Sequence, residues 1–245
     1  MPAVLAIDAG TTGVRTIAID HHGRALASSY REFTQHFPRP GWVEHDANEI
    51  WEAVQTTLAE VSGSLDEPAV AIGITNQRET VVAWSRSTSQ PLYRALVWQD
   101  RRTADRCAQL EAGGLLPTVR DRTGLVLDPY FSGSKIEWLL TQGGVRVSPD
   151  LAVGTIDSWL IWKPTGGRVH ATDATNASRT LLYDIRDLAW SPQLADAFGI
   201  PLDVLPEVRA SSGSFGTTAH DAACGPGIPI SGVAGDQHAA LFGQA

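Results

Sequence analysis

The stretch Ala6-Ile-Asp-Ala-Gly-Thr-Thr-Gly-Val-Arg-Thr-Ile-Ala-Ile-Asp20 decides the fold of this chain. It predicts two apolar β-strands joined by a polar turn that contains Gly10 and Gly13. Glycine tolerates positive φ and allows close backbone approach, so the turn can direct several N–H groups at one point and bind an anion. Asp8, at the end of the first strand, would repel that anion unless a divalent cation lay between them. The stretch therefore fits either a metal–polyphosphate site or a plain tight hairpin.

Length and composition limit the class of protein. The 245 residues, 43% of them hydrophobic, are enough for one large α/β domain or two small ones. The net charge of −8 argues against nucleic acid or an anionic membrane as the main partner. Cys107 and Cys224 lie far apart, which favours a reducing, cytoplasmic compartment over a structural disulfide or zinc site. We expect no integral membrane segment, because no apolar run reaches spanning length.

Hydrophobic periodicity predicts strands alternating with helices. Residues 47–61 show the clearest helical spacing, with Asp46 placed as an N-cap. Further expected helices are 103–110, 132–141, 155–163, a helix from 191 capped by its serine, and one beginning at 237; further expected strands are 24–30, 69–75, 81–84, 95–98 and 227–235. Residues 123–130 and 173–179 are expected to be loops.

Polar clusters follow two of the apolar strands. Residues 76–80 follow the strand 69–75, and residues 99–102 follow the strand 95–98. In open α/β sheets, ligands bind at the carboxyl ends of strands, so these clusters are candidates for a site. The alternative for Arg78 and Glu79 is a structural ion-pair cluster. Asp236 lies where a strand passes into a helix, and its alternative role is a helix N-cap.

Three short motifs with known chemistry can be compared with the sequence directly. Ser132-Gly-Ser-Lys135 matches the S-x-x-K signature of acylating serine enzymes, but the companion S-D-N and K-T-G signatures are missing. The chain also contains neither a Walker A motif nor G-x-G-x-x-G. Phosphate binding, if it occurs, is therefore not of the P-loop type.

Taken together, a series of sequence blocks resembles the N-terminal half of bacterial glycerol kinases in the FGGY family of carbohydrate kinases. The blocks occur in family order along essentially the whole chain. They are Pro40-Gly-Trp-Val-Glu-His-Asp46, Gly73-Ile-Thr-Asn-Gln-Arg-Glu-Thr80, Val97-Trp-Gln99, Thr123-Gly-Leu-Val126, Asp128-Pro-Tyr-Phe-Ser-Gly133, Thr175-Asn-Ala-Ser-Arg-Thr180, Leu205-Pro-Glu-Val-Arg209, Gly235-Asp-Gln237 and Ala240-Leu-Phe-Gly-Gln244.

The resemblance implies an α/β fold of the ribonuclease-H-like, actin/hexokinase type, with a mixed β-sheet flanked by helices. Residues 1–245 would form the N-terminal, polyol- and phosphate-binding domain, and the C-terminal nucleotide domain would be absent from this chain. The implied activity is ATP-dependent phosphorylation of glycerol to sn-glycerol 3-phosphate, with ATP and Mg²⁺ as cofactors. A homo-oligomer is expected for the full-length protein. The alternatives are a kinase for a related polyol or sugar, and a truncated polyol-binding module without catalytic activity.

The resemblance also implies roles for individual residues. Asp236 is the expected catalytic base, and Asp8 is expected to serve the metal. The residues expected to bind substrate are Arg78, Glu79, Trp98, Tyr130, Asp236 and Gln237, and those expected to contact the nucleotide phosphates are Thr11, Thr12, Gly13 and Arg15. Gly13 stands where the family usually has serine, so it keeps the backbone donor and lacks a hydroxyl. A triol needs several donors and acceptors and one apolar wall, which such a set provides.

Overall fold

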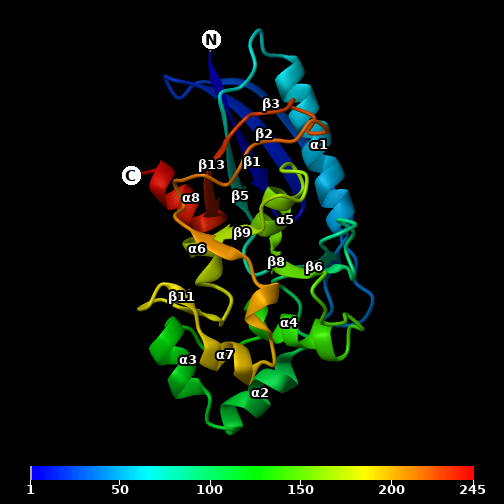
Figure 1. The fold of residues 1–245 in the computed structure, drawn as a ribbon, viewed down its shortest axis with the longest axis vertical. Coiled ribbons are helices and arrows are strands. Elements are labelled where there is room, and N and C mark those ends of the chain that lie inside the picture. The colour runs from blue at the N-terminus through cyan, green and yellow to red at the C-terminus, as the bar shows by residue number, and fades with distance from the viewer. Residues whose placement is uncertain (1) are drawn as a thin grey trace.

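A computed structural model describes residues 2–245 and confirms a mixed β-sheet flanked by helices (Figure 1). The main sheet has five strands in the order β13-β5-β1-β2-β3. Its strands are β1 (Ala3–Ala9), β2 (Gly13–Asp20), β3 (Ala25–Glu32), β5 (Ala71–Asn76) and β13 (Ile230–Gly235). The opening stretch forms the predicted antiparallel hairpin β1–β2, and 24–30 forms the predicted third strand β3, shifted slightly along the chain.

A second, smaller sheet lies next to the first and has the order β4-β7-β6-β8. Its strands are β4 (Glu44–His45), β6 (Val81–Ser85), β7 (Ala95–Leu96) and β8 (Leu151–Thr155), and two short pairs join β9 (Ala171–Asp173) to β12 (Glu207–Arg209) and β10 (Tyr183–Asp184) to β11 (Ala189–Trp190). The helices are α1 (Ala47–Gly63), α2 (Ala104–Ala112), α3 (Leu116–Thr123), α4 (Ser132–Thr141), α5 (Ile156–Trp162), α6 (Ala174–Ala177), α7 (Pro192–Ala197) and α8 (Asp236–Gly243), with a 3₁₀ turn at Leu202–Val204. In Figure 1, α1 runs along the main sheet and α2, α3 and α7 gather at the opposite end of the molecule.

Helix α1 forms as its sequence predicts. The Asp46 side chain accepts a hydrogen bond from Asn48 N–H and so caps the first turn. Ile50, Val54 and Leu58 are buried against the main sheet, because their spacing places them on one helical face. This packing fixes β2 and β3 and, through them, the hairpin turn.

Strand direction brings three chain segments to one edge of the main sheet. Strand β5 is parallel to both β1 and β13, and Asn76 at its end is aligned with Ala9 and Gly235. The residues that follow these three strand ends are therefore neighbours in space, although they are far apart in sequence. This is the edge at which the strand-end argument predicts a site.

Glycine has one of its two expected roles in the hairpin turn. Neither Gly10 nor Gly13 adopts positive φ, so that part of the expectation is wrong. Close approach is required at Gly13, where a Cβ atom would lie 2.6 Å from both the Tyr30 hydroxyl oxygen and the Arg31 carbonyl oxygen. Side chains larger than hydrogen are therefore excluded at Gly13 unless β3 moves.

Several elements differ from the sequence expectations. Residues 173–179 were expected to be a loop, but they contain α6, whose first turn is capped by Asp173 through Thr175 and Asn176 N–H. Helix α3 and strand β8 were not predicted, and α3 ends inside the expected loop 123–130, at Thr123. Helix α3 carries several charged and polar residues, which weakens the apolar periodicity on which the helix prediction depends.

None of the helices in residues 2–245 combines the length and the apolar character needed to cross a bilayer.

Buried Asp157, in the first turn of α5, gives a prediction on stability. Burial, reinforced by the negative charge of Asp173, raises its pKa from 3.8 to about 7. The folded state therefore retains a proton that the unfolded state has lost, so the contribution of Asp157 to stability declines as pH rises from about 4 to about 7. We expect Asp157→Asn to remove this slope, which is at most about 1.4 kcal/mol per pH unit. Urea unfolding of both proteins at pH 5 and pH 7 measures it; equal slopes would contradict the assignment.

Candidate functional site

A cavity of about 90 Å³ lies at the predicted edge of the main sheet. It is lined by Thr11, Arg78, Glu79, Trp98, Tyr130, Asp236 and Gln237. All six residues that the sequence predicted to bind substrate are in this set. The seventh, Thr11, was predicted to contact phosphate. The predicted substrate residues and the predicted phosphate residues therefore meet at Thr11.

Glu79 is placed in the cavity by an unusual turn. It has φ +62°, and Thr80 N–H donates to the Arg78 carbonyl oxygen at 2.7 Å, which closes a three-residue γ-turn around Glu79. Such a conformation is strained for a residue with a side chain and is found preferentially at functional sites. Burial raises the pKa of the Glu79 carboxyl, and Arg179, which donates to it at 2.8 Å, opposes that rise.

Arg78 connects the end of β5 to the start of α8. Its guanidinium is buried and lies 3.3 Å from the Asp236 carboxylate, and it also donates to Gln237 Oε1 at 2.5 Å and to His238 Nδ1 at 3.3 Å. Asp236 is the first residue of α8, with Gly235 as the N-cap, so the N-cap alternative for Asp236 is wrong. Half of the Asp236 side chain remains exposed, which leaves the carboxylate accessible to a ligand.

Two aromatic rings form the apolar wall of the cavity. Trp98 and Tyr130 meet edge to face with their ring centroids 5.6 Å apart. The Trp98 indole N–H donates to the Thr11 hydroxyl at 3.0 Å. This bond ties the wall to the hairpin turn and leaves the Thr11 hydroxyl hydrogen available to donate to a ligand.

The residues predicted to contact phosphate and metal lie on the hairpin itself. Gly10 N–H donates to the Gly13 carbonyl oxygen at 3.0 Å and closes the turn around Thr11 and Thr12. Arg15 is directly opposite Asp8 in the strand register. Desolvation by the surrounding protein raises the pKa of the Asp8 carboxyl, although the side chain reaches solvent, and the negative charge of Asp236 adds to the rise.

The carboxylates of Asp8 and Asp236 suit Mg²⁺ that is shared with substrate phosphates, and not a metal ion that is coordinated by protein side chains alone. Among residues 2–245, no group of three His, Cys, Asp or Glu side chains is arranged to hold a metal ion. Mg²⁺ commonly binds to one or two carboxylates together with water and substrate phosphates. The mutual repulsion of Asp8 and Asp236 is the kind that a divalent cation relieves.

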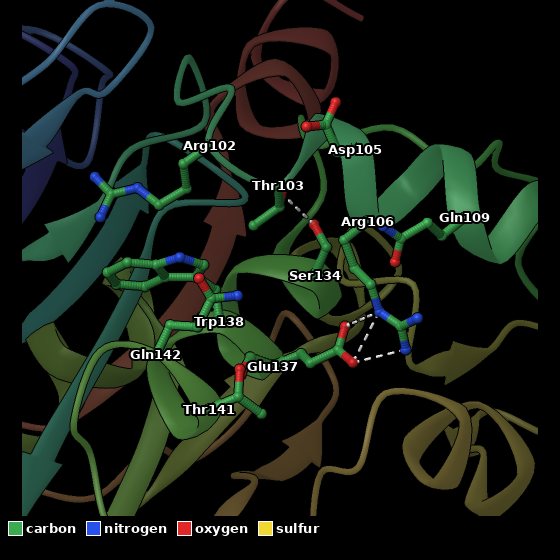
Figure 2. Close-up of a pocket in the computed structure, with 10 residues that line it drawn as sticks. All are labelled: Arg102, Thr103, Asp105, Arg106, Gln109, Ser134, Glu137, Trp138, Thr141 and Gln142. Atoms are coloured by element: carbon green, nitrogen blue, oxygen red, sulfur yellow. Dashed lines mark hydrogen bonds and ion pairs between the residues drawn. The ribbon is translucent and has the colours of Figure 1, made fainter.

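A larger cavity, of about 390 Å³, lies between α2 and α4 (Figure 2). It contains none of the predicted site residues. Three of its four charged side chains are in ion pairs: Arg106 contacts Glu137 at 2.7 Å (Figure 2), and Arg102 contacts Glu44 and Asp100 at 2.8 Å each. Size alone therefore does not identify the site, whereas the convergence of polar groups and an apolar wall does.

The sequence did not predict the residues that hydrogen-bond to the cavity-lining residues and hold them in place. Arg179 binds Glu79, and Ser132 and Lys135 bind the backbone of two cavity-lining residues. Arg179 lies within one of the blocks that carried the family resemblance, but nothing in the sequence indicated its partner. A contact between residues 100 positions apart depends on the fold and has no local signal.

Comparison with known proteins agrees with the sequence blocks. The family model described as "FGGY family of carbohydrate kinases, N-terminal domain" matches residues 3–243. Glycerol kinases of Vibrio atlanticus and Aeromonas salmonicida are 51% and 52% identical to the chain over 98% of its length. The chain spans about half the length of these curated relatives, 49% in both cases.

Solved structures show the same fold. A Plasmodium falciparum glycerol kinase structure, described as a complex with ADP, superposes with a TM-score of 0.93 and 34% identity, over 100% of this chain and 50% of that one. A Lactobacillus acidophilus gluconate kinase shares the fold with a TM-score of 0.89 and 20% identity, over 97% of this chain and 48% of that one. The chain therefore belongs to the FGGY family of carbohydrate kinases and corresponds to its N-terminal domain.

Proposed function

We propose that this chain is the substrate-binding half of an ATP-dependent kinase that phosphorylates glycerol to sn-glycerol 3-phosphate. The observation that carries the proposal is the cavity in which Arg78, Glu79 and Asp236 face the wall formed by Trp98 and Tyr130. A triol offers several hydroxyls and one carbon edge, which match the polar side chains and the aromatic wall of this cavity. The C-terminal half that the relatives possess would supply the rest of the nucleotide site.

Each cavity residue has a task that fits its chemistry. The Glu79 carboxylate accepts a hydrogen bond from one glycerol hydroxyl, Arg78 donates to the oxygen of a second, and Gln237 donates to or accepts from a third. Trp98 and Tyr130 pack against the carbon edge. Asp236 takes the proton of the attacking hydroxyl as its oxygen bonds to the γ-phosphorus of ATP and the bond from that phosphorus to the bridging oxygen breaks.

The hairpin turn would hold the phosphates of ATP. The backbone N–H groups of the turn and the hydroxyls of Thr11 and Thr12 donate to phosphate oxygens, and Arg15 adds a positive charge. Gly13 has no side chain and would contribute only its backbone. Tyr30 occupies the space that a side chain at this position would need. Mg²⁺, when bound near Asp8, would neutralise charge on the phosphates.

The proposal extends to the cellular setting. The thiols of Cys107 and Cys224 are both free, which fits a cytoplasmic protein. A homo-oligomer is proposed for the full-length protein, as in the expectation from the family resemblance.

A direct test compares substrates. We expect the full-length protein to phosphorylate glycerol with a kcat/KM at least about a hundredfold above that for xylulose or gluconate, because the additional polar groups of those molecules would have no matching donor or acceptor in this set of side chains. A coupled ADP-release assay measures the rates. A preference for a sugar would support the alternative of a related kinase. Glycerol binding by calorimetry with no ADP release would support a polyol-binding module instead.

A further inference from the structure

The S-x-x-K sequence has a role other than acylation. Ser132 and Lys135 lie one turn apart at the start of α4, and both side chains are fully buried. The Lys135 ammonium donates to the carbonyl oxygens of Pro129, Tyr130 and Phe131 at 2.7, 2.7 and 2.9 Å. All three N–H groups are thus directed at backbone acceptors, and the lysine is not placed to deprotonate Ser132.

Lys135 holds one wall of the cavity. The three carbonyls that it binds are consecutive, and the middle one belongs to Tyr130, whose ring lines the cavity. Burial lowers the pKa of Lys135 to about 7, while the negative charges of Glu79, Asp100 and Asp128 oppose that fall. A buried cation is tolerated only where its donors are satisfied, which the three carbonyls achieve.

Ser132 holds Glu79, a second residue that lines the cavity. Its hydroxyl donates to the Glu79 carbonyl oxygen at 3.1 Å. Glu79 is the residue with φ +62° at the centre of the γ-turn, so its backbone conformation persists only where neighbouring groups stabilise it. Arg179 binds the Glu79 carboxylate, and Ser132 binds the backbone behind it.

We propose that Ser132 and Lys135 are positioning residues that fix two cavity-lining residues, Glu79 and Tyr130, and so set the affinity for the polyol. The inference rests on the proposed function and names the hydrogen bonds that hold the cavity-lining residues in place. Neither residue touches the substrate; each acts through a backbone carbonyl of a residue that does.

Ser134 provides a matched control for Ser132. It lies in the same turn and is equally buried, but its hydroxyl pairs with Thr103 Oγ1 at 2.8 Å on the side of the larger cavity (Figure 2). In the full-length protein, we expect Ser132→Ala to raise KM for glycerol about fivefold, the effect of one hydrogen bond, with KM for ATP unchanged. Ser134→Ala should leave both KM values unchanged. Equal changes in the two variants, or no change in Ser132→Ala, would overturn the proposal.

Hydrogen exchange in the ligand-free chain, followed by mass spectrometry, tests both residues without any assay of activity. Ser132→Ala should accelerate exchange in residues 77–81, and Lys135→Met should accelerate it in residues 128–132, each leaving the other segment unchanged. Where Lys135→Met does not fold, Lys135→Arg replaces it, because it keeps the charge but not the three-carbonyl geometry. Unchanged exchange at residues 128–132 in the folded Lys135 variant would overturn the proposal. A wild-type protein that fails to phosphorylate glycerol would contradict the proposed function and leave this exchange result standing.

Discussion

Asp236→Asn is expected to lower kcat for glycerol phosphorylation by about 10²–10⁴-fold, the usual loss when a positioned general base is removed. Asparagine keeps an oxygen that can accept the Gln237 N–H bond, which is 2.8 Å long in the native chain. It cannot accept the proton of the attacking hydroxyl. The effect should therefore fall on kcat, measured by steady-state ADP release at saturating glycerol and ATP.

The fold of this variant should be intact, because the Asp236 side chain is 46% exposed and supports no core packing. Thermal unfolding checks this point. Glu111→Gln is a suitable control, since it removes an exposed carboxylate at the end of α2, which lies at the end of the molecule away from α8 in Figure 1. An Asp236→Asn protein with the native kcat would remove Asp236 from the mechanism, whatever its effect on KM.

Gly235→Ala is expected to raise KM for glycerol by about tenfold to a hundredfold. A Cβ atom at position 235 would lie 2.6 Å from Arg78 Cγ and closer still to Cδ. Arg78 is buried and bonded to Gln237 and His238, so it cannot move aside without losing those contacts. Hydrogen bonds that involve a charged group contribute about 1.5–3 kcal/mol each, which sets the size of the expected loss.

Gly73→Ala is the matched control for Gly235→Ala. Gly73 lies in β5, the neighbouring strand, and a Cβ atom there would meet nothing within 4 Å. Its KM should match that of the native protein. Glycerol titration by calorimetry gives the affinities directly, and a Gly235→Ala protein that binds glycerol as tightly as the native chain would mean that Arg78 does not contact the substrate.

Much of the fold could be predicted because its signals are local. The hairpin β1–β2 follows from two apolar runs around a Gly/Thr turn, and α1 follows from the spacing of Ile50, Val54 and Leu58 after a capping Asp46. Helix α4 has the predicted bounds, Ser132–Thr141. Helix α6 was missed because its four residues are too few to show a period, and its cap Asp173 reads as a turn residue.

The members of the candidate site could be predicted, but the contacts that hold them in place could not. Its members could be named in advance because the family resemblance assigns them and because Arg78, Glu79 and Asp236 follow strand ends. The structure brings all six residues that were predicted to bind substrate into one cavity. The γ-turn at Glu79 and the Lys135 contacts are local, but no pattern in the sequence marks either of them. The contacts of Ser132 and Arg179 with Glu79 could not be predicted, since they join residues 53 and 100 positions apart. The need for glycine at position 13 likewise depends on Tyr30, a residue of another strand.

The hydrogen bond between Trp98 and the Thr11 hydroxyl has a thermodynamic consequence for the proposed kinase. Trp98 belongs to the wall that is proposed to face the polyol, and Thr11 belongs to the turn that is proposed to face the phosphates. If binding of one ligand orders Trp98 and Thr11, binding of the second ligand no longer carries that entropic cost. Each ligand then raises the affinity for the other by the same factor. Binding of glycerol and ATP would then be positively coupled. The coupling free energy should be the same whether glycerol is titrated with and without ATP or ATP is titrated with and without glycerol.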